Sequence, residues 1–210
     1  NQVVSKALQE KDILLREIHH RVKNNLQMIS ALLYLHGKSL DDTPAQAALM
    51  ESQNRVQSMA IIHQNLYQQE NLLGVGVQEY LDKLIHHLID SYNIEKDRIE
   101  IYKRIEIQHL DVDTVIPLAL IINELISNAL KYAFRDGRKG VIHVNIEMVD
   151  GLIKLEVKDN GIGFPETNAG GGNFGFKLIH ILSERLGATL NINSDKGTSV
   201  TLLVPQIKAA

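Results

Sequence analysis

The second half of the chain contains the run Val157-Lys158-Asp159-Asn160-Gly161-Ile162-Gly163, in which an apolar strand passes into a loop. Side chains alternate between the two faces of a strand, so we expect Asp159 on the same face as Ile153 and Leu155. A carboxylate on an apolar face needs a polar partner, because burying it alone is costly. The run therefore predicts either a binding site at the end of this strand or a tight turn, for which Asp-Asn-Gly is a common sequence.

A ligand that carries an amino group is a suitable partner for Asp159, and the exocyclic amino group of adenine has this chemistry. Gly161 and Gly163 would let the backbone approach such a ligand closely, because glycine has no Cβ. The pair Gly197-Thr198 begins the last predicted strand and would close the same site from another side.

A second glycine-rich run, Gly170-Gly171-Gly172-Asn173-Phe174-Gly175, precedes a predicted helix. Backbone N–H groups at a helix start bind phosphate, and a flexible loop is the alternative. The run is not a P-loop, because Gly175 is followed by Phe176-Lys177-Leu178 rather than by Lys and then Ser or Thr. The dinucleotide-binding fingerprint fails as well, since Glu166 stands where its third glycine should be.

A long helix predicted at residues 114–134 has one apolar side and one polar side. The apolar side comprises Leu118, Ile122, Ile126, Ala129 and Ala133. On the opposite side, Glu124, Asn128 and Lys131 lie within about 60° of one another. Carboxylate and amide oxygens suit Mg²⁺, and an ammonium group suits phosphate. We therefore expect these three residues to receive Mg²⁺ and phosphates, with a solvated helix face as the alternative.

Further helices are predicted at residues 77–92 and 176–186. Strands are predicted at residues 99–107, 141–148, 152–157, 189–193 and 198–204. Hairpins mixed with helices in this way indicate an α/β sandwich, with helices on one face of a mixed, mostly antiparallel sheet.

The first third of the chain predicts a helical hairpin, with helices at residues 4–38 and from Pro44 to residue 69 and a helix end at Gly37. One hairpin buries little by itself, so we expect a second copy to pack against it as a four-helix bundle. Residues 73–77 hold two glycines, and we place the boundary between two domains there, at residues 1–73 and 74–210.

The first helix carries two adjacent histidines. Its apolar stripe is centred near Val22, from which His20 lies about 160° away and His19 about 60° away, so His20 is expected to project into solvent. An exposed imidazole can act as a nucleophile when a carboxylate or amide orients its ring, and Glu17 and Asn24 lie about one turn away. The alternative is a solvated helix face with two ordinary histidines.

Composition narrows the possible functions. The 210 residues, 44% of them hydrophobic, are enough for one or two domains with a core. A net charge of −3 argues against an electrostatic nucleic-acid binder, and the absence of cysteine excludes disulfides and thiolate metal sites. No apolar run reaches 18 residues, so we expect no membrane contact by this chain. Because it begins at Asn1 without a methionine, we interpret it as a fragment of a longer protein.

In their order along the chain, these motifs resemble those of sensor histidine kinases of two-component signalling. Glu124-x-x-x-Asn128-x-x-Lys131 resembles the N box, Asp159-x-Gly161-x-Gly163 the first glycine box, Gly170–Gly175 the second, and Gly197-Thr198 the terminal glycine-threonine element. Together they resemble the Bergerat ATP-binding fold shared with gyrase, Hsp90 and MutL. The segment from His19 to Gln27 resembles the phosphoacceptor helix of the second HisKA subgroup, which is related to the HWE kinases.

The resemblance implies a protein-histidine kinase that uses Mg-ATP to phosphorylate His20. The phosphoryl group would then pass to an aspartate of a response-regulator receiver domain. The family implies a homodimer, and we expect a cytoplasmic location. By the resemblance, Asn128 ligates Mg²⁺, Glu124 acts near the phosphates and the metal, and Lys131 contacts the phosphates. Asp159 reads adenine, and the glycines form a lid.

Two features depart from the commoner kinase pattern. His20 is followed by Arg21 instead of an acid, so we expect Glu17 or Asn24 to orient the ring. The lid, at residues 164–174, is short and has no clear Phe box. Two other interpretations stay open: an ATPase of the gyrase or Hsp90 type, and a helical interaction module with a degenerate nucleotide site.

Overall fold

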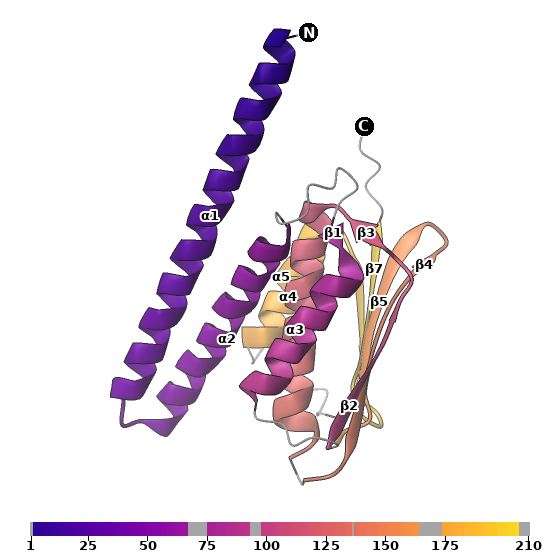
Figure 1. Cartoon of the computed structure of the whole chain (residues 1–210). Helices are drawn as coiled ribbons and strands as arrows, with labels where there is room; N and C mark the ends of the chain where they lie inside the picture. The colour runs from indigo at the N-terminus through magenta and orange to yellow at the C-terminus, as the bar shows by residue number, and fades with distance from the viewer. Residues whose placement is uncertain (1, 67–74, 93–97, 136, 164–173, 206–210) are drawn as a thin grey trace. The chain divides into compact units, whose positions relative to one another are not determined.

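The computed structural model describes residues 2–66, 75–92, 98–135, 137–163 and 174–205. The chain divides into two compact units, Asn1–Leu72 and Leu73–Ala210, which are described separately below (Figure 1).

The first unit is a hairpin of two long helices, α1 (Gln2–Ser39) and α2 (Thr43–Leu66). The predicted end of the first helix at Gly37 is wrong, because α1 continues to Ser39. A Cβ at Gly37 would lie 3.8 Å from the Cβ of Leu49 on α2, which is an ordinary van der Waals contact. Gly37 therefore lies where the two helices pack together, within the last turn of α1.

Much of the apolar surface of this hairpin remains exposed within a single copy. Ser58 and Asn54 of α2 are buried. Among the side chains of this unit that the structure describes, the exposed large hydrophobic ones are Ile18, Met28, Ile29, Leu32, Tyr34, Leu35 and Met50. One hairpin thus leaves a stripe of apolar side chains without cover from its own two helices.

The second unit is built on a five-stranded sheet with strand order β2-β4-β5-β7-β6. The strands are β2 (Ile99–Ile105), β4 (Gly140–Val149), β5 (Leu152–Asp159), β6 (Thr189–Asn193) and β7 (Ser199–Pro205). Strands β2 and β4 are parallel, and every other pair is antiparallel. The predicted mixed, mostly antiparallel sheet is confirmed. The sequence did not predict the small sheet of β1 (Val75–Gly76) and β3 (His109–Leu110).

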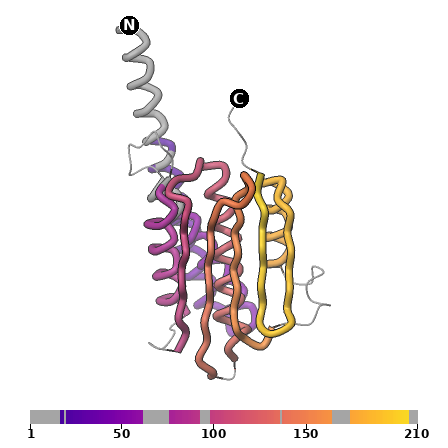
Figure 2. Tube along the Cα trace, turned by 90° about the vertical axis from the view of Figure 1, so that its right-hand side faces the viewer, coloured from indigo at the N-terminus to yellow at the C-terminus, as the bar shows by residue number. Residues whose placement is uncertain are grey.

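Helices cover one face of the sheet, as Figure 2 shows with the strands in front and the helices behind. They are α3 (Val77–Ser91), α4 (Val112–Asn128), the π-helical turn η1 (Ala129–Ala133) and α5 (Phe174–Arg185). Strand residues that face the helices alternate with less buried ones, so Ile153, Leu155 and Val157 of β5 are all buried. The core therefore lies between the sheet and this helical layer.

The central helix, α4, is apolar nearly all round and buried on both sides. Asp111 caps its start by accepting a hydrogen bond from the Thr114 backbone N–H at 2.8 Å. Residues Val112–Ala133 are long and apolar enough to cross a membrane by length and composition alone. However, 72% of this apolar window is buried inside the protein, and the buried core helix of a folded domain has the same length and composition.

Candidate functional site

Asp159 ends β5 with its carboxylate on the helix-facing side of the sheet. It is only 6% exposed and shares that face with Ile153, Leu155 and Val157, as the strand alternation predicts. Its Oδ1 accepts hydrogen bonds from the backbone N–H groups of Gly161 at 2.8 Å and Thr198 at 3.2 Å. Burial raises the pKa of Asp159 above its usual value, and the hydrogen bonds from Gly161 and Thr198 oppose this shift.

Two segments far apart in the sequence close around Asp159. The end of η1 lies against the loop after β5, where the Ile162 N–H donates to the Ala133 carbonyl at 3.1 Å. From the other side, the Asp159 N–H donates to the Thr198 carbonyl at 2.8 Å. The helix end, the strand end and the β6–β7 turn therefore meet at one carboxylate.

The glycines of this region are explained by contacts within the protein. A Cβ on Gly161 would collide with Ala133, and one on Gly197, which has a φ of +91°, would collide with the Asp159 carbonyl. Gly163 has a φ of +69° and would place a Cβ 2.9 Å from the Ser194 Oγ. These residues thus hold the site together.

The second glycine run is only partly described. Gly175 is buried within α5, near the start of that helix. Gly170, Gly171 and Gly172 lie outside the described residues, and so does the predicted lid except for Phe174, which begins α5.

Glu124 and Asn128 are more buried than residues of a solvated helix face, the alternative interpretation of this pattern, would be. Glu124 is 2% exposed on α4, and Asn128 ends that helix with a buried Nδ2 that has no hydrogen-bond partner among the described residues. An amide end left unpaired in the interior is costly, so Asn128 is a candidate for contact with a ligand or an ion. The Nζ of Lys131 lies 5.8 Å from the ring centre of Tyr92.

The last turn of this helix differs from the prediction of a continuous α-helix to residue 134. Residues Ala129–Ala133 form a π-helical turn, which includes Lys131. Such turns are rare and often mark functional sites. The periodicity of an α-helix therefore does not extend to Lys131, whereas Glu124 and Asn128 lie within α4.

His20 lies on α1 and is exposed, as the helical wheel predicts. The backbone of His19 is helical, but its side chain lies outside the described residues. Glu17 accepts a hydrogen bond from the Arg21 Nε at 2.8 Å, and Asn24 is exposed. In this arrangement the carboxylate of Glu17 is engaged by the next turn of the helix.

Asn160 is a residue of the site that the sequence pattern did not single out. Its backbone N–H donates to the Val141 carbonyl at 3.2 Å, and its side-chain Oδ1 accepts from the Val141 N–H at 2.8 Å. The side chain thus takes the place of the Asn160 carbonyl in the ladder, and the main chain can turn away towards Ala133. Asn after a strand end is a signal for such a bond, because Asx side chains commonly hydrogen-bond to nearby backbone.

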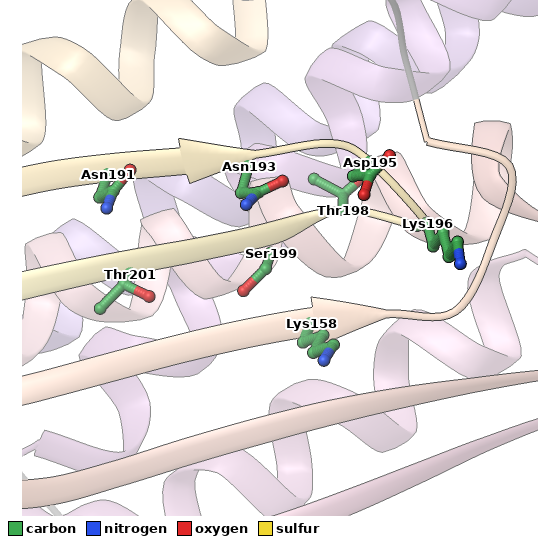
Figure 3. Close-up of a pocket in the computed structure, with 9 residues that line it drawn as sticks. Lys158, Asn191, Asn193, Asp195, Lys196, Thr198, Ser199 and Thr201 are labelled. Carbon is green, nitrogen blue, oxygen red and sulfur yellow. The ribbon is translucent and has the colours of Figure 1, made fainter.

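A polar hollow of about 380 Å³ lies beside the β6–β7 turn, over strands β5, β7 and β6 (Figure 3). Gly197 and Thr198 line it, and Thr198 also donates to Asp159 through its backbone. The sequence alone gave no indication of this hollow.

Family profiles match both parts of the chain in order. The profile "Histidine kinase" of the HisKA_2 type matches residues 17–92. The profile "Histidine kinase-, DNA gyrase B-, and HSP90-like ATPase" matches residues 113–208. The first includes His20, and the second includes Asn128, Asp159 and Thr198.

Whole sequences and solved structures agree with the profiles. The sensor histidine kinase PdtaS of Mycobacterium tuberculosis is 32% identical over 206 residues, which are 95% of this chain and 41% of PdtaS. Blue-light-activated histidine kinase 2 of Erythrobacter litoralis is 28% identical over 93% of this chain and 58% of its own length. The solved histidine kinase domain of the Erythrobacter litoralis EL346 blue-light-activated kinase has a TM-score of 0.67 at 25% identity, covering 95% of this chain and 94% of that domain. The chain therefore spans 41% and 58% of the lengths of these two curated relatives.

Proposed function

Because the chain belongs to the sensor histidine kinases, we propose that it is a kinase core that binds Mg-ATP at Asp159 and transfers the γ-phosphoryl group to His20. In this proposal the first unit presents the phosphoacceptor histidine and mediates dimerisation. The second unit, from about residue 74, binds the nucleotide.

The observation that carries the proposal is the buried carboxylate of Asp159. Two backbone N–H groups occupy its Oδ1, at 2.8 Å and 3.2 Å, and fix the side chain at the edge of the core. A fixed acceptor in an apolar setting suits the amino group of adenine, because a ligand without that group would leave the buried carboxylate poorly satisfied. Gly161, Gly163, Gly197 and Thr198 support this geometry.

Glu124 and Asn128 are suited to hold Mg²⁺ near the phosphates. Both are oxygen-bearing side chains one turn apart on α4, and the buried amide end of Asn128 has no partner among the described residues. Rotation of that amide presents its oxygen at the same place, and hard oxygen ligands are those that Mg²⁺ prefers. When bound, the ion would neutralise charge on the phosphates, to which Lys131 and the N–H groups of Gly170, Gly171, Gly172 and Gly175 would add contacts.

The exposed imidazole of His20 then acts as the nucleophile. A neutral ring nitrogen attacks the γ-phosphorus, the bond from phosphorus to the bridging oxygen breaks, and ADP leaves with the electron pair. The opposite ring nitrogen must carry its proton or lose it to a nearby acceptor. Glu17 and Asn24 are the candidates on the same helix, and Glu17 must leave Arg21 to take that role.

Incubation of the chain with γ-labelled ATP and Mg²⁺ tests the proposal. We expect a label that acid removes, that His20→Ala abolishes and that His19→Ala retains. Label that survives His20→Ala would contradict the assignment of the acceptor. Hydrolysis of ATP without any acid-labile label would instead favour an ATPase of the gyrase or Hsp90 type, and binding without reaction would favour a degenerate module.

The remaining parts of the proposal concern the partners and the location. The phosphorylated His20 would pass its phosphoryl group to an aspartate of a response-regulator receiver domain, and the chain would act as a cytoplasmic homodimer. The apolar side chains exposed on α1 and α2 support the dimer.

A further inference from the structure

The hollow beside the β6–β7 turn lies on the face of the sheet opposite to the helices of the second unit. Its floor consists of residues that alternate with the buried core positions: Lys158 next to buried Val157 and Asp159, and Ser199 and Thr201 on either side of buried Val200. It is therefore separated from the Asp159 carboxylate by the thickness of the sheet.

The strand register explains why the surface is hollow there. Ser199 of β7 pairs with Lys158 of β5 on one side and with Asn193 of β6 on the other. Thr201 and Asn191 are paired in the same way one step further along the strands. The small side chains of β7 thus form a trough, and the longer side chain of Lys158 stands at its rim (Figure 3).

Most of the polar side chains that line this hollow make no hydrogen bond or ion pair with one another or with other described residues, although Thr198 hydrogen-bonds to Asp159. Among the described residues, no hydrogen bond or ion pair is made by the side chains of Lys158, Asn191, Asn193, Lys196, Ser199 and Thr201. The neighbouring outward-facing groups behave differently. Lys154 donates to Glu147 at 3.0 Å, and Asn145 donates to Glu156 at 3.3 Å, which draws that carboxylate towards β4.

Charge and shape select the kind of ligand. Two ammonium groups, on Lys158 and Lys196, face the hollow together with amides and hydroxyls, and Asp195 is the one acid that lines it. Within the described part of the chain, the lining has neither aromatic side chains nor large aliphatic ones, so a hydrophobic ligand has little to contact. Ammonium, amide N–H and hydroxyl groups together suit a phosphate group.

We propose that this hollow, defined by Lys158, Lys196, Ser199, Thr201, Asn191 and Asn193, binds the phosphate group of a small molecule. The site is separate from the nucleotide site, although Thr198 borders both. The volume of about 380 Å³ is sufficient for free phosphate or for a sugar phosphate.

The test is a titration of the whole isotope-labelled chain with inorganic phosphate, followed by backbone amide NMR shifts. Saturating ADP keeps phosphate out of the nucleotide site, and chloride holds the ionic strength constant. We expect saturable shifts centred on residues 191–201. The double variant Lys158→Gln, Lys196→Gln should weaken binding about tenfold, because it removes two charge-assisted contacts.

Lys154→Gln is the matched control, since it removes a lysine from the same face of β5 outside the hollow. It should leave phosphate binding unchanged. Shifts that do not saturate, that respond equally to Lys154→Gln, or that centre on residues 124–133 would overturn the proposal. A parallel titration with glucose 6-phosphate distinguishes the two sources, because tighter binding of the ester identifies a phosphorylated metabolite and equal binding identifies the phosphate group alone.

Discussion

At the scale of single residues, Asp159 combines a proposed role in nucleotide binding with a cost in stability. Its carboxylate is held in place by two backbone N–H groups, yet burial raises its pKa because the charged form loses hydration. The folded state therefore binds the proton of Asp159 more tightly than the unfolded chain does. The contribution of this group to stability is present at low pH and is lost as the pH rises through the window above 3.8, the ordinary value.

The variant Asp159→Asn separates the effect of this carboxylate on stability from its proposed role in nucleotide binding. The amide keeps Oδ1 as an acceptor for Gly161 and Thr198 but carries no charge, so we expect a higher Tm than that of the wild type at pH 7. The difference should shrink as the pH falls towards 3.8, where the wild-type carboxyl is itself protonated. ATP affinity should fall by at least about tenfold, because the acceptor for the adenine amino group is lost. Thermal unfolding across this pH range and a nucleotide titration measure both effects. A lower Tm at pH 7 would show that the charge stabilises the fold.

Gly197→Ala isolates the close approach of the β6–β7 turn to Asp159. Gly197 has a φ of +91° and no room for a Cβ beside the Asp159 carbonyl. Gly151 has a φ of +79°, and a Cβ added there would meet nothing within 4 Å. Gly151→Ala is therefore the control, because it introduces backbone strain without a steric clash. We expect Gly151→Ala to cost about 1–2 kcal/mol of unfolding free energy and Gly197→Ala distinctly more. Denaturant unfolding of both variants measures these free energies. Equal losses would mean that the turn can move to accommodate the Cβ at no additional cost.

At the scale of elements, helix and strand positions follow from the sequence where the pattern is local. The predicted strand at residues 189–193 matches β6, and the predicted hairpins and the core face of β5 are present. Two details differ from the prediction. Gly37 does not end α1, which continues to Ser39, and the turn at Ala129–Ala133 is π-helical, with the Ala133 carbonyl bound to a distant loop.

In the candidate site, too, only the features that depend on a single helix or strand could be predicted from the sequence. Asp159, Asn128 and His20 are placed by periodicity, since each depends on the face of one element. The role of Asn160 depends on Val141, 19 residues earlier, and the hollow depends on the pairing of three strands. Such information lies in the register between strands, which a single sequence does not display.

The exposed apolar stripe of α1 predicts an effect on assembly. Leu32 is 54% exposed and Leu35 is 61% exposed on the hairpin, although leucine favours burial. We expect the double variant Leu32→Glu, Leu35→Glu to convert the proposed dimer into a monomer, because two charges would be buried in the bundle. Light scattering after size-exclusion chromatography measures the mass. Met148→Glu, at an exposed apolar position of β4, is the control and should remain dimeric. A dimer that survives the α1 variant would place the interface elsewhere.

At the scale of the whole molecule, the proposed nucleotide site and the proposed phosphoacceptor lie in different units, which can be produced as separate fragments. A fragment of residues 73–210 contains the entire five-stranded sheet and its helical layer. We expect it to bind ATP with an affinity within about threefold of that of the full chain, since the proposed nucleotide contacts all lie in it. It should acquire no label by itself and should label a fragment of residues 1–72 on His20. Loss of ATP binding in the isolated fragment would show that the first unit contributes to the nucleotide site.

The burial of α4 also has a consequence for biosynthesis. This helix is made before β4, β5, β6 and β7, and the last of these strands ends only at Pro205. At translation rates of about 5–20 residues per second, an apolar segment of membrane-spanning length stays partly uncovered for several seconds on the ribosome. During that interval its hydropathy resembles that of a nascent transmembrane segment, so we expect prompt completion of the sheet to limit the exposure of this apolar surface to aggregation.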